Sequence, residues 1–187
     1  MRFIYKSCSW LTKLAFYLQT VHLILQTCIS LTIVAIHFSN VASHFTIKRT
    51  NLATLAFWAF ASTNPGKIMF SLKKGAYSLE LLAEKKEAVL AIPGVELTGA
   101  LIGCGTCSGR DTDKAAQVGL TMQEVEGTNI KAPVPCKLLI HATVAQTMDA
   151  DDHVVHLCDV KGVYGDEDVD AVFGWKGYAE FAAAQQK

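Results

Sequence analysis

The chain has 187 residues, of which 51% are hydrophobic and 18% are charged, and its formal net charge is zero at pH 7. This length suits one domain with a substantial core, and nothing in the acidic half of the chain, which follows Leu79, suggests nucleic-acid binding. Charge is unevenly distributed, because all 17 acidic residues follow Leu79 whereas eight of the 17 basic residues precede it. The basic front half suits a phosphate-bearing ligand or a membrane surface.

The first feature in chain order is an apolar run from Leu14 to Ile36, which has no charged residue if His22 is neutral. Its length matches a membrane span of about twenty residues, and the basic residues before it would keep the N-terminus in the cytoplasm. Polar residues such as Gln19 and Gln26 weaken that interpretation. A buried pair of strands, a packed helix and a non-native segment remain open.

These observations divide the chain into two parts. Residues 1–45 form an atypical apolar segment, a candidate membrane anchor or non-native sequence, and residues 46–187 form the predicted domain. We expect a cytoplasmic protein, with membrane tethering through residues 14–36 as the alternative.

From Asn51 onward, short apolar stretches alternate with turn signals, as in Thr63-Asn-Pro-Gly66, where proline and glycine favour a tight turn. Ser78 is the predicted N-cap of a helix that runs to about Lys86, and Gly119 is expected to close a brief helix after Asp113. Strands are predicted over residues 51–61 (with a bend), 67–72, 87–92, 136–146 and 153–164, further helical segments over 96–102, 113–118 and 178–184, and turns over 63–66, 103–109, 149–152 and 165–170.

Cys104 and Cys107 form a CxxC motif inside the glycine-rich segment from Gly103 to Gly109. A structural zinc site would need a second ligand pair, and a thioredoxin-type dithiol would need the motif to open a helix, which the glycines disfavour. The six cysteines also lack the spacing of a disulfide framework, so we expect a reduced, intracellular protein without a metal site. A redox role for the CxxC pair is the weaker alternative.

Many short strands, few helices and a long hairpin favour an antiparallel barrel over a parallel α/β sheet. There is no phosphate-binding P-loop and no GxGxxG after a strand, so neither a nucleotide kinase nor a Rossmann fold is indicated.

Several motifs together carry a resemblance to a known family. In order, they are Asn51-x-x-Thr54, Asn64-Pro65, Lys73-Lys-Gly-Ala-Tyr-Ser78, Ser108-Gly-Arg-Asp-Thr-Asp-Lys114 and Asp152-His153-Val-Val. From about Asn51 to Tyr178 the chain resembles the flavin reductase-like family of FMN-binding split barrels, and it is most similar to the flavoredoxin branch. The resemblance implies a mainly β fold, an antiparallel Greek-key split barrel with a few short helices.

The same resemblance implies a homodimer with FMN near the subunit interface. The isoalloxazine would follow the strand from Asn51 to Phe57, and the phosphate would lie near the start of the Ser78 helix, where N–H groups and the helix dipole favour an anion. Lys73 and Lys74 could equally solvate a turn, and Asp113 could pair with Lys114. The implied cofactor-binding residues are Asn51, Thr54, Ala56, Phe57, Ser71, Lys73, Lys74, Tyr77, Ser78, Ser108 and Lys114.

The implied activity is that of a flavin reductase-like oxidoreductase, in which electrons from NAD(P)H pass through FMN to a flavin, a metal complex or a redox protein partner. The cofactor carries the chemistry, so no catalytic side chain is predicted. Family members usually place two strands and a glycine turn ahead of the Asn51 element, but His37 to Thr50 contains no glycine and no clear turn. The alternative is therefore an incomplete or membrane-tethered split-barrel module that binds without turnover.

Overall fold

The computed structural model describes residues 2–3, 32–42 and 45–172. The predicted helix over residues 178–184 and residues 14–31 of the apolar run lie outside these ranges. The strands are β1 (Arg2–Phe3), β2 (Thr32–Ala42), β3 (Phe45–Leu55), β4 (Trp58–Thr63), β5 (Gly66–Lys73), β6 (Glu87–Pro93), β7 (Met122–Glu124), β8 (Lys131–Pro133), β9 (Cys136–Ala150) and β10 (His153–Gly165). The helices are α2 (Tyr77–Lys85), the 3-10 helix η1 (Val95–Leu97), α3 (Thr98–Thr106) and α4 (Lys114–Gln117).

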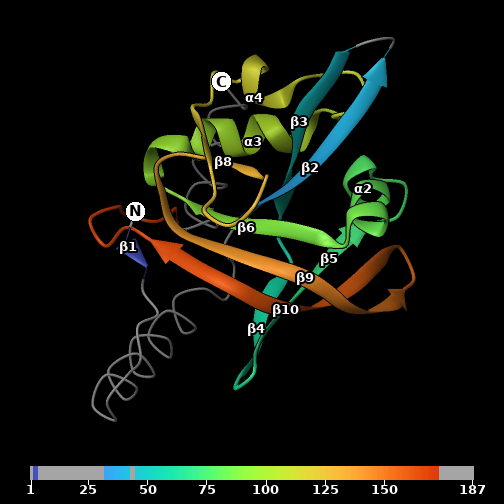
Figure 1. Cartoon of the computed structure of the whole chain (residues 1–187), viewed down its shortest axis with the longest axis vertical. Helices are drawn as coiled ribbons and strands as arrows, with labels where there is room; N and C mark the ends of the chain where they lie inside the picture. Colours follow the sequence, from blue (N-terminus) through green and yellow to red (C-terminus); the bar gives the residue numbers. More distant parts are fainter. Residues whose placement is uncertain (1, 4–31, 43–44, 173–187) are drawn as a thin grey trace, which may run out of the picture.

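The main sheet is antiparallel, with the strand order β3-β2-β6-β9-β10-β5-β4, and β1 pairs with β10. Its two edge strands, β3 and β4, are consecutive in the chain and are joined by only two residues, Ala56 and Phe57. Laid flat, seven strands would separate these edges by roughly 29 Å, whereas such a link spans on the order of 10 Å. The sheet therefore curls until its edges meet, which confirms the predicted split barrel (Figure 1).

Side chains alternate between two cores on the two faces of the sheet. On β6, Ala88 and Leu90 join the core inside the barrel, whereas Val89 and Ala91 join a second core outside it. Leu81 and Leu82 of α2 pack into the inner core. The outer core lies between the sheet, α3 and the small β7–β8 hairpin, which the sequence analysis did not predict (Figure 1).

The strands that open the barrel are present. β2 and β3 pair from Thr32↔Leu55 to Ala42↔Phe45, and β2 also pairs with β6. Ile33 and Ile36, at the end of the apolar run, are fully buried. The fold thus includes residues 32–42, which the sequence analysis had placed before the domain. Within the part of the chain that is described, no helix is long and apolar enough to cross a membrane.

Three local expectations require correction. The N-cap of α2 is Ala76, without a side-chain capping bond, and Ser78 lies buried one residue inside the helix. Helix α3 continues through Gly103 and Gly105 to Thr106, because its packing on the outer core outweighs the low helix propensity of glycine. The long hairpin turns only at residues 151–152, since β9 extends to Ala150.

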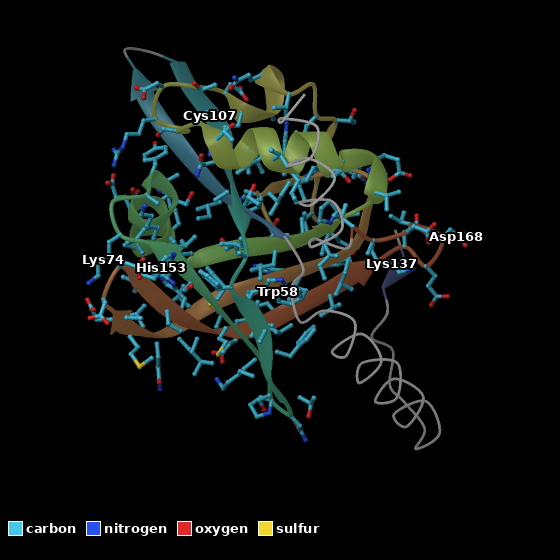
Figure 2. All side chains as sticks on the ribbon, turned by 180° about the vertical axis from the view of Figure 1, so that it is seen from behind. Trp58, Lys74, Cys107, Lys137, His153 and Asp168 are labelled. Atoms are coloured by element: carbon cyan, nitrogen blue, oxygen red, sulfur yellow. The ribbon has the colours of Figure 1, made fainter. Side chains whose placement is uncertain are left out.

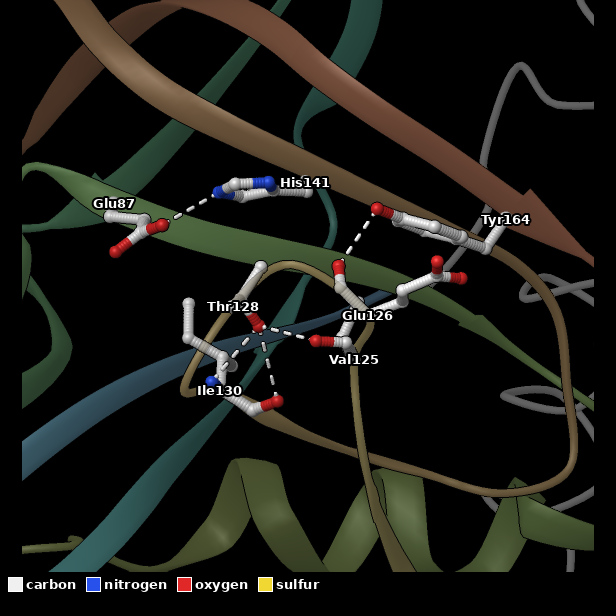
Figure 3. A network of polar contacts seen from close by, with 7 residues as sticks. All are labelled: Glu87, Val125, Glu126, Thr128, Ile130, His141 and Tyr164. Carbon is white, nitrogen blue, oxygen red and sulfur yellow. Dashed lines mark hydrogen bonds and ion pairs between the residues drawn. The ribbon is translucent and has the colours of Figure 1, made fainter. Parts of the chain in front are cut away.

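A polar network fastens the β7–β8 connection to the sheet (Figure 3). The hydroxyl of Tyr164 on β10 donates to the carbonyl of Glu126 at 2.8 Å, and the Thr128 hydroxyl bonds the backbone of Val125 at 2.9 Å. On the neighbouring strands, His141 Nε2 lies 2.7 Å from Glu87 Oε1. The Tyr164 bond thus ties the β7–β8 connection to the sheet, the Thr128 bond fixes the turn within that connection, and the His141–Glu87 contact joins β9 to β6.

Candidate functional site

Two of the predicted site residues, Asn51 and Ser78, meet in a buried contact. Asn51 ends up inside the barrel because it alternates with the outward-facing Leu52, and its side chain is only 4% exposed. Asn51 Nδ2 donates to Ser78 Oγ at 2.8 Å, while Asn51 Oδ1 has no hydrogen-bond partner among the described residues. Because an amide has two donors and an acceptor, exchanging its nitrogen and oxygen would still leave one buried polar atom unpaired.

Residues 107–113, which we call the strap, lie over this amide. A Cβ added to Gly109 would meet Asn51 Oδ1 at 1.9 Å, so only glycine permits this close approach. The next residue, Arg110, forms an ion pair with Glu80 and places its guanidinium carbon 4.9 Å from the centre of the Tyr77 ring. The strap is thus anchored on the first turns of α2, immediately beside the unpaired amide.

Thr54 and Lys114 both form hydrogen bonds to the backbone of α3. Thr54 Oγ1 donates to the Leu101 carbonyl at 2.5 Å, and Lys114 Nζ donates to the Cys104 carbonyl at 2.8 Å. Burial lowers the pKa of Lys114, and its coupling to the nearby thiols partly offsets that effect. Asp113 accepts a bond from the Ala116 N–H and so caps α4. Thr54 therefore holds α3 against β3, and Lys114 ties the end of α3, where the strap begins, to α4.

A third group of predicted residues gathers where β5 leads into α2, beside the tip of the β9–β10 hairpin (Figure 2). Phe57 is 63% exposed, and its ring meets that of His153 edge-on at 5.6 Å. Lys74 Nζ lies 2.6 Å from Asp149 Oδ2, and this contact lowers the pKa of the Asp149 carboxyl. His153 Nδ1 lies 2.9 Å from Asp152 Oδ1. Hence the charge of Lys74 is already partly compensated, a feature that no sequence spacing indicated.

The remaining predicted residues lie between these groups. Ala56 is exposed in the link between β3 and β4, Lys73 is exposed at the end of β5, and Ser108 is exposed in the strap. The Ser71 N–H donates to the Phe57 carbonyl at 3.0 Å, which ties the link to β5.

The site also contains residues that the predicted set omitted. Gly109 and Arg110 stood in the motif that carried the resemblance, so their sequence context was the available signal. Glu80 and Asp149 gave no such signal, because they reach the site only through the packing of α2 and the hairpin. Together, the site offers an unpaired buried amide, a helix N-terminus, lysines and an exposed aromatic ring.

Comparison with known proteins identifies the family and the fold of this chain. A family model described as "Flavin reductase like domain" matches residues 34–182. Among solved structures, the flavoredoxin of Desulfovibrio vulgaris (Miyazaki F) superposes with a TM-score of 0.63 at 21% identity, covering 77% of this chain and 76% of that chain. An NADH:FAD oxidoreductase of Streptomyces globisporus C-1027 gives 0.65 at 11% identity, over 82% and 88% of the two chains. An FMN-binding protein of Thermus thermophilus, solved with 1-cyclohex-2-enone, gives 0.63 at 14% identity, over 74% and 71%.

Proposed function

The chain belongs to the flavin reductase-like domain family, and from this premise we propose that it is an FMN-binding oxidoreductase that carries electrons from NADH or NADPH to a flavin, metal or protein acceptor. Two proteins with the same fold support this proposal: one is an FMN-binding protein and the other is an NADH:FAD oxidoreductase. When bound, FMN supplies the redox chemistry, and the protein supplies position and electrostatics.

The observation that carries the proposal is the unpaired amide of Asn51. A buried polar group without a partner costs about 1–3 kcal/mol, and an apolar residue would avoid that cost at this position. The polar edge of a flavin ring presents both acceptors and an N–H donor, so it can complete the amide in either orientation. Since the strap covers this atom, the strap must shift when the ring enters.

The other proposed contacts with FMN follow from where each residue lies in the fold. Ala56 and Phe57 would line the ring because they connect the edge strands beside Ser71. The start of α2, with Tyr77 and Ser78, would receive the phosphate, because the first N–H groups of a helix point toward an anion there. Thr54 and Lys114 would act indirectly, by holding α3, and Ser108 would move with the strap.

The two lysines should contribute unequally to phosphate binding. Lys73 is exposed at the end of β5, whereas Lys74 is paired with Asp149. We therefore expect Lys73→Glu to weaken FMN binding by about tenfold, or about 1.4 kcal/mol, and the matched Lys74→Glu variant to weaken it less. Fluorescence titration of each variant with FMN measures this, and equal losses would remove the distinction.

A second copy of the chain is the proposed partner at the outer face of β9, β10 and β5. Val155 lies opposite Met148, and Leu157, two residues further, lies opposite Met69, so these side chains share one sheet face. Met148 is 63% exposed and Met69 is 44% exposed, and Phe57 borders them. Contiguous exposed apolar residues of this kind are typical of protein interfaces.

Charge at the rim of that face supports a homodimer. The ion pairs Lys74–Asp149 and Lys67–Asp159 bring both signs of charge to its edges. In a two-fold dimer the same patch meets itself, so a patch that carries both signs can be complementary to its copy. Because Phe57 borders this face, the flavin would lie close to the interface.

The direct experiment is an absorbance spectrum of the purified full-length protein, followed by FMN titration and stopped-flow reduction with NADH and with NADPH. We expect visible flavin bands, or binding on titration, and bleaching by at least one nicotinamide. A chain that neither retains nor binds FMN or FAD would overturn the proposal. Binding without bleaching would instead favour a module without turnover.

A further inference from the structure

The C-terminal end of α3 carries two thiols three residues apart. Cys104 is fully buried in the outer core, and Cys107 lies half-buried just beyond the helix, in an extended conformation with φ −130° and ψ 163° (Figure 2). Cys107 Sγ donates to the Gly103 carbonyl at 3.5 Å, so this thiol lies against the last turn of the helix that carries Cys104. A disulfide needs Cβ atoms about 3.5–4.5 Å apart, and backbone rotation at Cys107, which has left the helical conformation, can bring the two sulfurs together.

A buried lysine lies next to this pair. Lys114 is only 8% exposed, donates to the Cys104 carbonyl at 2.8 Å and is coupled electrostatically to both thiols. Burial raises the pKa of the Cys104 thiol to about 11, so this group stays protonated near neutral pH. Cys107 is the more accessible sulfur, and the ammonium group gives a sulfur anion formed there a counter-charge.

Movement of Cys107 would be transmitted to the flavin site, because Cys107 is the first residue of the strap. Two residues further on, Gly109 lies against Asn51, and Arg110 is anchored to Glu80 and Tyr77. A displacement of Cys107 would therefore move the neighbouring residues of the strap that cover the unpaired amide of Asn51.

We propose that Cys104 and Cys107 form a reversible disulfide that displaces the strap from α2, uncovers the Asn51 amide and so strengthens flavin binding. The oxidant is a hydroperoxide, such as the hydrogen peroxide that reduced flavin forms with dioxygen. The consequence for the flavin rests on the proposed function, whereas disulfide formation and the displacement of the strap do not.

The chemistry balances in two steps. The Cys107 sulfur, having given up its proton, attacks one peroxide oxygen, the O–O bond breaks, and the departing hydroxide takes the proton to form water. The Cys104 sulfur then attacks the sulfenic sulfur of Cys107, the S–O bond breaks, and the hydroxide leaves as water with the proton of Cys104. Two thiols are thereby oxidised to one disulfide as one peroxide is reduced to two waters.

Peptide mapping tests the disulfide. Trypsin releases residues 87–110 as one peptide that contains both cysteines. After treatment of the full chain with equimolar hydrogen peroxide, this peptide should be lighter by two hydrogen atoms, and dithiothreitol should reverse the change. Cys107→Ser should abolish the loss, and Cys136→Ser, a variant at another buried thiol, should retain it. Two free thiols in the peptide, or sulfinic acid at Cys107, would overturn the proposal.

Limited proteolysis of the folded protein tests the strap without any flavin. Release of Arg110 from Glu80 should make trypsin cut after Arg110 about fivefold faster in oxidised protein, a change of about 1 kcal/mol in the cost of local opening. Cys107→Ser treated in the same way should show no increase. Equal rates in oxidised and reduced wild-type protein would contradict the displacement.

FMN titration of both redox forms then tests the link to binding. We expect a gain of affinity of about tenfold on oxidation, because the strap no longer has to be moved off Asn51 when the ring enters. An unchanged affinity would overturn this link. A chain that binds no flavin in either form overturns the proposed function instead, while proteolysis still decides whether the strap moves.

Discussion

At the scale of single residues, Asn51 is the clearest test of the site. Asn51→Ala should reduce FMN affinity by about tenfold, because it removes the polar atom assigned to the ring edge. Stability of the flavin-free protein should change by less than about 1 kcal/mol, because the buried Ser78 hydroxyl loses its partner while the unpaired amide oxygen is removed as well. FMN titration and urea unfolding measure the two effects separately.

The matched control is Asn64→Ala, since Asn64 is exposed in the turn between β4 and β5. It should leave both affinity and stability close to wild type. A similar loss of affinity in both variants would show that Asn51 has no specific role in binding.

His156 makes a prediction about pH at the same scale. It is 2% exposed inside the barrel, its ring stacks on Phe70 at 5.3 Å, and its Nδ1 has no hydrogen-bond partner among the described residues. Burial lowers the pKa of His156 below 6.5, two backbone hydrogen bonds oppose that change, and the charge of Lys86 adds to it. As the pH falls, His156 is therefore protonated at a higher pH in the unfolded chain than in the folded protein.

The free energy of unfolding that neutral His156 contributes is fully present above about pH 6.5. It is lost as the pH falls toward the lower pKa of His156 in the folded state. Urea midpoints at about pH 7.5 and about pH 5.5 measure the loss. His156→Phe, which cannot titrate, should lose less between these two values than wild type. An identical pH dependence in the variant would exclude His156 as the source.

At the scale of elements, α3 and the strap show how context overrides local sequence. The glycines of this segment favour a turn by propensity, yet Gly103 and Gly105 are helical because Leu101 and Cys104 pack into the outer core. The turn begins only at Cys107. What the sequence predicted as one glycine-rich loop is therefore a helix end followed by a strap.

Substitution by alanine should have different effects at two glycines of this region. Gly109→Ala would place a Cβ on Asn51, so we expect a displaced strap and an FMN affinity changed by at least about fivefold. Gly99→Ala meets nothing within 4 Å inside α3 and should stabilise the protein by about 0.5–1 kcal/mol. Thermal unfolding and FMN titration compare the pair, and a neutral Gly109→Ala would argue against close packing of the strap.

At the scale of the whole molecule, the exposed apolar face predicts the state of assembly. Met148→Glu should convert a dimer to a monomer, because it places a charge within the proposed interface, at a side chain that is 63% exposed in the single chain. Sedimentation velocity on the full chain measures this directly. Val95→Glu is the control, since Val95 is also exposed, at 49%, but lies in η1 on another part of the surface. A wild-type monomer, or dissociation by both variants, would contradict the assigned face.

Much of the strand order along the chain follows from the sequence. Turn residues such as Pro65 and Gly66 and the alternation within residues 136–164 are local signals, and the structure confirms a hairpin at each. The opening strands β2 and β3 were harder to predict, because they pair across a junction with no glycine and because residues 32–36 end a run long enough to suggest a membrane segment. β2 also pairs with β6, a contact that links Ile33 to Ala91, more than fifty positions further along the chain.

The sequence by itself determined the motifs of the flavin reductase-like family and the antiparallel character of the fold, because turn chemistry and two-residue alternation act between near neighbours. Only the tertiary structure decided which polar groups are already paired within the protein and which remain available to bind a ligand. Closure of the barrel buries Asn51 beside Ser78, packing directs Lys114 to the end of α3, and the hairpin tip brings Asp149 to Lys74. Those pairings depend on strands that meet from distant parts of the chain, and no local pattern specifies them.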